Sequence, residues 1–272
     1  MSVNHSEISS FIWNVCDDVL RGLFKPHEYG DIILPFTVLR RLDCVLEEHK
    51  DTVINLHNEF KSKVEDPTPI ILNKVNTSFF NHSQFDLNRL KQDPSNIQMN
   101  LQNYLGGFSN NVLEVVENFQ LEKPIEKLNK NNRLYHFIEK FSEIDLHPDV
   151  VSNHQMGQVF EELLRKFSEM SNETSGEHYT PRDVVRLLVS LVFSKDKDEL
   201  QGEGKVRSIF DPCCGTGGML TIGKDWVQNN INDKVEFRLL GQELNPQTFS
   251  ICKSDMMITG ENPENIRQGS SL

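Results

Sequence analysis

Residues 206–258 alternate between short apolar runs and helical patterns, and a glycine-rich turn follows the first run. The apolar runs are 206–210 and 237–240, and the helical patterns cover 220–229 and 246–258. Strand, turn, helix, strand and helix in this order are typical of the start of a parallel α/β sheet. Two strands do not make a stable sheet of this kind, and the chain ends at Leu272 where a third strand is expected. We therefore expect the α/β region to be C-terminally truncated.

The first half of the chain carries helical periodicity. From Ile8 to Leu23 the apolar side chains recur at spacings of three and four, and a second helix is predicted from Ile32 to about His49. Its apolar stripe consists of Ile33, Phe36, Leu39, Leu42 and Leu46. Shorter helical patterns cover residues 53–64, 111–119 and 134–141. The Asn-, Ser- and Gln-rich stretch 73–111 has no element boundaries that the pattern can place.

Two more helices are predicted before the first strand. One covers residues 156–167, and the polar loop 168–179 follows it. The other begins at Thr180-Pro181, because Thr favours the N-cap and Pro the first helical position. We predict a helical domain over residues 1–150 and an α/β domain over residues 151–272.

The charge of the chain argues against a stand-alone nucleic-acid binder. Lys and Arg number 28 and Asp and Glu number 40, a formal net charge of −12, and each half of the chain is acidic. A protein that binds the phosphates of a nucleic acid by itself carries more basic than acidic residues. The sequence lacks alanine and is only 37% hydrophobic, but its Leu, Ile, Val and 17 Phe residues suffice for a core. If DNA is the substrate, a partner is expected to supply much of the phosphate contact.

The cysteines and the N-terminus indicate a soluble, cytoplasmic protein. The five cysteines are odd in number and form no C-x-x-C pair, so we predict thiols in a reducing compartment. The sequence begins without a basic and apolar leader, and no apolar run is long enough to span a bilayer. The nine histidines show no metal-ligand spacing, so no metal site is predicted.

The glycine-rich turn after the first strand is the main candidate for ligand binding. It reads Asp211-Pro212-Cys213-Cys214-Gly215-Thr216-Gly217-Gly218. The glycines permit a tight turn, and the N-terminus of the next helix offers N–H groups to a carboxylate or phosphate. A purely structural turn is the alternative, and we interpret Cys213 and Cys214 as its spacer positions.

Glu243 follows the second predicted strand and is a candidate ribose ligand. A carboxylate there can accept hydrogen bonds from both ribose hydroxyls; the alternative is a helix-capping carboxylate. These features allow a nicotinamide or an adenosyl ligand. Asp211 favours the adenosyl ligand, since its carboxylate could meet an ammonium group. The dinucleotide pattern G-x-G-x-x-G is absent, because Leu220 stands where its last glycine is expected.

Three ordered motifs resemble a known family. They are GEHYTPRDVVRLLVSLV from Gly176, DPCCGTGGML from Asp211, and GQELNPQTFSICKSDMMITG from Gly241. Together they resemble the modification (M) subunit of type I restriction–modification DNA methyltransferases. The N-terminal half is similar to the family's helical assembly domain at WNxxxDVLRG from Trp13 and at ILPFTVLRRLD from Ile33. The resemblance covers nearly the whole chain and implies the start of a Rossmann-like class I methyltransferase domain.

The resemblance implies methyl transfer from S-adenosylmethionine to N6 of adenine in DNA. The implied cofactor-binding residues are Glu177, His178, Tyr179, Thr180, Pro181, Asp211, Gly215, Thr216, Gly217, Glu243 and Asn245. The glycine turn would wrap the methionine end of the cofactor, and Glu243 would hold the ribose. For Tyr179 the alternative is a core aromatic residue whose hydroxyl bonds the backbone.

The sequence departs from the family at two places. The Asn-Pro-Pro-aromatic motif that receives the target amine is absent, and Asn245-Pro246 and Asn262-Pro263 do not replace it. Gly269-Ser270 stands where the family has an acidic or amide contact to the adenine ring. We therefore predict no catalytic residue in this chain, which alone is expected to be inactive.

The implied partners are DNA, a specificity (S) subunit, a restriction (R) subunit and a second M subunit, with no membrane. One alternative is a non-catalytic assembly module of the same complex. A nicotinamide-dependent enzyme and a methyltransferase acting on a small molecule or protein are further alternatives. The missing dinucleotide pattern disfavours the former, and the N-terminal resemblance disfavours the latter.

Overall fold

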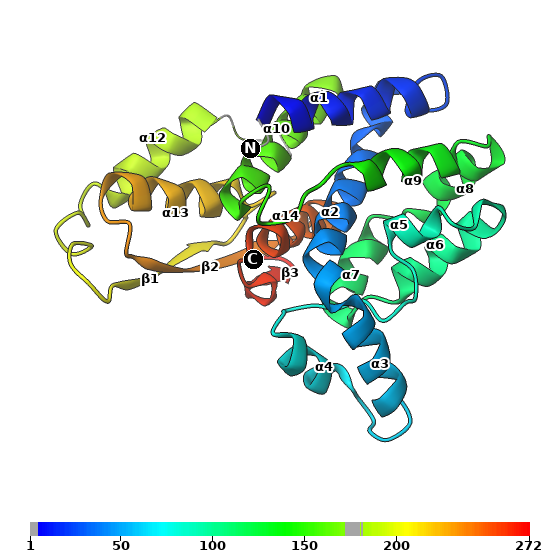
Figure 1. Ribbon diagram of the computed structural model, residues 1–272. Coiled ribbons are helices and arrows are strands. Elements are labelled where there is room, and N and C mark those ends of the chain that lie inside the picture. The colour runs from blue at the N-terminus through cyan, green and yellow to red at the C-terminus, as the bar shows by residue number, and fades with distance from the viewer. Residues whose placement is uncertain (1–4, 172–179, 181) are drawn as a thin grey trace. The chain divides into compact units, whose positions relative to one another are not determined.

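The computed structural model describes residues 5–171, 180 and 182–272. The chain divides into two compact units, Met1–Leu163 and Leu164–Leu272. The first unit is helical and the second contains a parallel sheet, which confirms the predicted fold class (Figure 1).

The helical unit is built mainly from short helices. Its α-helices are α1 (His5–Val15), α2 (Gly30–Leu46), α3 (Lys50–Phe60), α4 (Thr68–Val75), α5 (Leu87–Leu90), α6 (Ile97–Gly106), α7 (Asn110–Asn118), α8 (Glu122–Lys130) and α9 (Leu134–Glu143). A π-helical turn (Cys16–Leu20) continues α1, and 3₁₀ turns cover Pro26–Glu28, Glu47–His49 and Pro94–Asn96. The helices predicted from apolar periodicity are confirmed. The stretch without predicted boundaries holds α5, α6 and the end of α4, and α8 was not predicted.

Helix α2 is buried on all sides and not along one stripe. Every residue of the predicted stripe is buried: Ile33, Phe36, Leu39, Leu42 and Leu46. Arg40 and Asp43 lie on the side of this stripe and Arg41 on the opposite side, and all three are buried as well. A buried charged group needs partners, and α2 finds them in distant parts of the unit.

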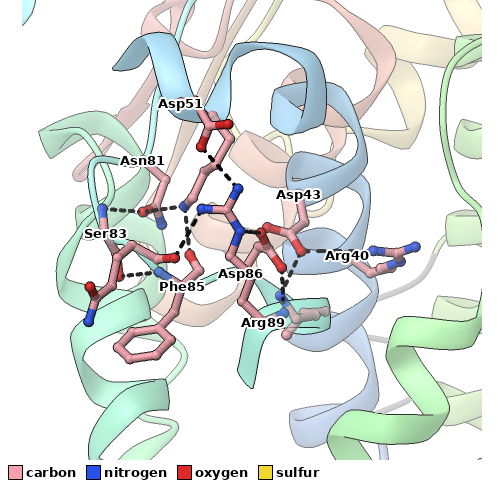
Figure 2. A network of polar contacts seen from close by, with 11 residues as sticks. Arg40, Asp43, Asp51, Asn81, Ser83, Phe85, Asp86 and Arg89 are labelled. Atoms are coloured by element: carbon pink, nitrogen blue, oxygen red, sulfur yellow. Dashed lines mark hydrogen bonds and ion pairs between the residues drawn. The ribbon is translucent and has the colours of Figure 1, made fainter. Parts of the chain in front are cut away.

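Asp43 is part of a polar network that Figure 2 shows from close by. Its Oδ2 accepts the Leu87 N–H at 2.9 Å and lies 3.8 Å from Arg40 Nη1. Lys50, also buried, donates to the Phe85 carbonyl at 2.6 Å. These bonds join α2 and the start of α3 to the segment that leads into α5.

Burial shifts the pKa values of both central groups in this network. It raises the pKa of Asp43 to about 6, although the Leu87 N–H, Lys50 and Arg40 favour the charged carboxylate. It lowers the pKa of Lys50 to about 8, which Asp43 and Asp86 partly offset. The folded unit therefore holds the Asp43 proton more tightly than the unfolded chain does.

The Asp43→Asn variant is expected to gain stability relative to the parent as pH rises from 4 to 7. The parent carboxyl ionises near pH 3.8 when unfolded and near pH 6 when folded, so its stabilising contribution is lost as pH rises through this interval. Asparagine does not titrate and still accepts the Leu87 N–H. Urea denaturation at pH 4 and pH 7 should show a relative gain on the order of 2 kcal/mol.

His82 titrates in the same pH interval, because burial lowers its pKa to about 4. Its contribution to stability therefore rises with pH, opposite to that of Asp43. Both proteins contain His82, so the difference between them isolates Asp43. An equal stability difference at the two pH values would contradict the assignment.

The second unit contains a three-stranded parallel sheet in the order β1-β2-β3. Its strands are β1 (Val206–Asp211), β2 (Glu236–Glu243) and β3 (Ile266–Gln268), and its helices are α12 (Arg182–Phe193), α13 (Gly218–Asn230) and α14 (Pro246–Thr259). A 3₁₀ turn, Pro263–Asn265, precedes β3, and α10 (Asn153–Ser171) spans the division between the units. Asp211 pairs with Gly241, and Gly241 with Ile266, so β2 extends beyond the end of β1 and pairs there with β3.

The third strand corrects the expectation that the chain stops before one forms. The strand β3 is short and has a single apolar residue, Ile266, which is buried in the core. Its pairing with Gly241–Glu243 of β2, and not an apolar pattern of its own, makes it a strand. It places the segment that follows it beside the carboxyl end of β2.

Two helices share one hydrophobic core with one face of the sheet. Leu220 of α13 and Phe249 and Met256 of α14 pack with Leu239 of β2, and Ile209 of β1 packs against them. On the opposite face of β1, Phe210 is 62% exposed. In the described part of the chain, β1 pairs with β2 alone.

Helix α12 also presents apolar side chains to solvent. They are Val184, Leu187, Leu188, Leu191 and Val192, whereas Val185 and Val189 are buried. Across the described ranges, no helix combines the length and apolarity needed to cross a membrane.

Candidate functional site

The turn between β1 and α13 forms the centre of the candidate site. Asp211 ends β1, and its Oδ1 accepts the Cys213 N–H at 3.0 Å. Gly215 has φ +55° and Gly217 has φ +90°, a backbone region that favours glycine. The Gly217 N–H donates to the Cys214 carbonyl at 2.8 Å, and α13 begins at the next residue. The turn therefore needs glycine at two of its positions.

Several N–H groups at this turn are available to a ligand. The N–H groups of Thr216, Gly218 and Met219 donate to no described residue. Two of them lie in the first turn of α13, where the helix dipole favours a negative group. Asp211 is half-buried, and its Oδ2 accepts no hydrogen bond from the described residues. A ligand with a carboxylate and an ammonium group fits this pair of features.

Glu243 lies at the carboxyl end of β2, beside the glycine turn. Its Oε2 accepts the Gly215 N–H at 3.0 Å and its Oε1 accepts the Asn245 N–H at 2.8 Å. Each carboxylate oxygen accepts two hydrogen bonds, so one position on each remains for a hydroxyl donor. The two interpretations of Glu243, ribose ligand and structural carboxylate, are compatible in this geometry.

Asn245 is the N-cap of α14. Its Oδ1 accepts the N–H groups of Gln247 at 2.9 Å and Thr248 at 3.1 Å. Both acceptor positions of this oxygen are thus used within the protein, and only the amide N–H₂ group is left for a ligand. The capping role also explains why α14 begins at Pro246.

Cysteine side chains pack tightly beneath the turn. A Cβ at Gly241 would lie 2.8 Å from Cys214 Sγ, and a Cβ at Gly217 would lie 2.8 Å from Cys252 Sγ. All five cysteines are thiols, and the sulfurs of Cys214 and Cys252 are 3.9 Å apart. The hydrogen bond between the two thiols, together with burial, raises the pKa of the Cys252 thiol well above its ordinary value. Cys214 is therefore a core residue and more than a spacer, whereas Cys213 is exposed.

The segment after β3 lies against the same turn. Gly269 N–H donates to the Glu243 carbonyl at 2.9 Å, and Ser271 Oγ donates to the Pro212 carbonyl. Gln242 Nε2 donates to the Ser270 carbonyl. Ser270 and Ser271 thus border the site with hydroxyl groups, and residues 269–272 carry no acidic side chain.

The structure brings five of the predicted cofactor-binding residues around one turn and places a sixth at its side. Asp211, Gly215, Thr216 and Gly217 belong to the turn, Glu243 bonds it, and Asn245 caps the neighbouring helix. Thr180 is exposed just ahead of α12. Glu177, His178, Tyr179 and Pro181 lie outside the described residues. In the described ranges, no three His, Cys, Asp or Glu side chains gather as a metal site would require.

Sequence reasoning missed Gly241, Cys214 and Cys252 as parts of the site. In the sequence these are small residues in different elements. Their pairing, glycine against cysteine, becomes visible only once the elements are aligned in space. The first predicted strand and the helix 246–258 were correct, but periodicity does not reveal that a thiol fills the space beside a glycine.

Two protein-family models match consecutive parts of the chain. The HsdM N-terminal domain matches residues 8–141, and the N-6 DNA Methylase domain matches residues 151–272. The order of the two matches follows the helical and α/β units.

Curated relatives and a solved structure agree with these matches. The chain is 24% identical to the type I restriction enzyme MjaIX methylase subunit of Methanocaldococcus jannaschii, over 93% of this chain and 46% of the relative. It is 32% identical to the EcoEI methylase subunit of Escherichia coli, over 50% of this chain and 26% of the relative. The fold is similar to a type I restriction-modification methyltransferase subunit from Streptococcus thermophilus, with a TM-score of 0.71 and 18% identity, over 99% of this chain and 59% of the other. The chain spans less than half the length of the MjaIX methylase subunit.

Proposed function

Because this chain belongs to the family of methylase subunits of type I restriction enzymes, we propose that its α/β unit binds S-adenosylmethionine for DNA adenine methylation. The observation that carries the proposal is the meeting of Asp211, the glycine turn and Glu243 at one edge of the sheet. Ligands of parallel α/β sheets bind at the carboxyl ends of the strands. The site has this position and a donor and acceptor set that fits the cofactor.

The amino-acid end and the ribose of the cofactor each have a complementary group in this chain. The Asp211 carboxylate would accept the ammonium group, and the N–H groups at the start of α13 would donate to the carboxylate. Glu243 would accept the ribose hydroxyls through its remaining acceptor positions. Glu177, His178, Tyr179, Thr180 and Pro181 are proposed as the remaining wall of the pocket. Asn245 can contribute only its amide N–H₂ group.

When bound, S-adenosylmethionine supplies an electrophilic methyl group, which we propose is transferred to N6 of adenine. The residues of this chain bind and orient the cofactor. They do not include the Asn-Pro-Pro-aromatic motif that would receive a base taken out of the duplex. We therefore propose that the chain by itself does not catalyse the transfer.

The partners are proposed from the family and the charge. We propose that the helical domain, with its boundary near residue 150, assembles with a specificity subunit, a restriction subunit and a second methylase subunit on cytoplasmic DNA. The net charge of −12 supports a division of labour in which other subunits provide most phosphate contacts. A non-catalytic assembly module is the second candidate, and the missing motif favours it.

Calorimetric titration of the chain with S-adenosylmethionine tests the cofactor site, with NAD as the control ligand. We expect binding of S-adenosylmethionine alone, and a loss of affinity of about tenfold or more in Asp211→Ala, which removes a charge-assisted hydrogen bond. Asp233→Ala changes an exposed carboxylate of the same unit and should leave the affinity unchanged. If the chain binds neither ligand, the assembly-module interpretation replaces the cofactor site.

A further inference from the structure

Glu243 connects two turns that are far apart in the sequence. Its Oε2 accepts the N–H of Gly215 in the β1–α13 turn, and its Oε1 accepts the N–H of Asn245 in the β2–α14 turn. The side chain is half-buried, so water screens these charge-assisted bonds only in part. One carboxylate thus fixes the glycine turn relative to the strand that bears it.

The base of the glycine turn has several other attachments, whereas its outer part has, besides Glu243, only a weak contact in the described residues, from Cys214 Sγ to the Gly215 carbonyl at 3.8 Å. The Cys214 N–H donates to the Gln242 carbonyl at 3.0 Å, and Gly217 packs on the Cys252 thiol. Between these points, the Gly215 N–H has Glu243 as its partner among the described residues. The position that a Cβ of Gly215 would occupy is open, with no atom within 4 Å. Glu243 thus holds the Cys214–Gly215 peptide by its N–H, and the Gly217 N–H holds the same peptide by its carbonyl. The Gly215–Thr216 peptide continues from this fixed unit.

The Thr216 N–H belongs to the Gly215–Thr216 peptide, next to the one that Glu243 holds, and has no partner among the described residues. It lies just ahead of the N–H groups at the start of α13, which the proposed function assigns to the carboxylate of the cofactor, and it is likewise available to a ligand. We propose that Glu243 is a positioning residue for the glycine turn and thereby sets the affinity for the amino-acid end of the cofactor. This inference rests on the proposed function and adds a second role to the ribose contact.

The two roles of Glu243 predict different ligand selectivity. A residue that contacts only the ribose contributes equally to every ligand that carries the ribose. A residue that also orients the turn contributes more to a ligand with the amino-acid end. S-adenosylhomocysteine carries this end, and 5′-methylthioadenosine has the same nucleoside without it.

The experiment compares both ligands by calorimetry in the parent, Glu243→Gln and Glu243→Ala. We expect the affinity for S-adenosylhomocysteine to fall about tenfold further than that for 5′-methylthioadenosine. Equal losses for the two ligands would overturn the positioning role. Glu236→Gln, an exposed change at the other end of β2, is the matched control and should alter neither affinity.

Amide hydrogen exchange without ligand separates this inference from the proposed function. In Glu243→Ala the N–H groups of Gly215 and Asn245 both lose their acceptor, so exchange at Gly215 should rise at least severalfold. The exchange of α13 should stay unchanged, which shows that the unit remains folded. Unchanged exchange at the turn would overturn the inference even if the cofactor binds, and faster exchange would support it even if the cofactor does not bind.

Discussion

Arg41→Ala is expected to destabilise the helical unit by about 3–5 kcal/mol. Arg41 is fully buried in α2, and its guanidinium donates to the carbonyls of Leu146 and Val151 and to Asn153 Oδ1. The substitution leaves two buried carbonyl oxygens without this donor and opens a cavity the size of the side chain. Urea denaturation monitored through Trp13 fluorescence, in a Trp226→Phe background, reports on this unit because the chain has two tryptophans.

The cost of burying the Arg41 charge offsets part of the stability that its hydrogen bonds and packing contribute. Burial lowers the pKa of Arg41 to about 10, so the folded unit bears a cost for holding the cation. Arg41→Met removes the charge but keeps most of the stem, and we expect it to lose less stability than Arg41→Ala. Arg21→Ala, at a side chain that is 76% exposed, should change stability by no more than about 0.5 kcal/mol. A loss below about 1 kcal/mol in Arg41→Ala would show that the carbonyls find other donors.

The polar residues of α2 mark the limit of prediction from local pattern. The stripe through Leu39 and Leu42 identified the helix and its buried face. Arg40 and Arg41 find their acceptors more than one hundred residues further along the chain, at Ile144 and Leu146. Periodicity within a helix cannot reveal such partners, and charged residues of a helix are usually solvated. The burial of these charged residues was therefore not predicted.

Helix α8 was missed for a different reason. Leu121, Ile125 and Leu128 are buried and recur at spacings of four and three, which is a helical signal. Pro124 lies between them and interrupts the pattern for a reader of the sequence. In the structure it is the third residue of α8, in the first turn, where a helix tolerates the missing N–H.

The sequence predicted which residues form the candidate site but not the contacts between them. The glycine turn and Glu243 follow successive strands, and parallel pairing brings strand ends to one edge, so their proximity follows from the predicted order. The bond from Gly215 to Glu243 depends on the exact register of β1 and β2, which the sequence does not specify. The same register decides that Gly241 faces Cys214.

Gly217→Ala is expected to destabilise the α/β unit by about 2–4 kcal/mol, because it imposes two costs at one position. The backbone at Gly217 has φ +90°, which an alanine rarely adopts, and its new methyl group would lie 2.8 Å from Cys252 Sγ. Trp226 fluorescence in a Trp13→Phe background reports unfolding of this unit. Where the cofactor site exists as proposed, the variant should also lose most of its affinity, since the N–H groups at the start of α13 move with the turn.

The neighbouring glycine provides a matched control. An added Cβ at Gly218 meets no atom within 4 Å and needs no unusual φ, so Gly218→Ala should change stability by less than about 1 kcal/mol. Cys252→Ala combined with Gly217→Ala removes the steric conflict but keeps the backbone strain. This double variant should therefore lose less than the sum of the two single losses. Additive losses would mean that backbone strain alone makes glycine necessary at position 217, and that Cys252 does not constrain the turn.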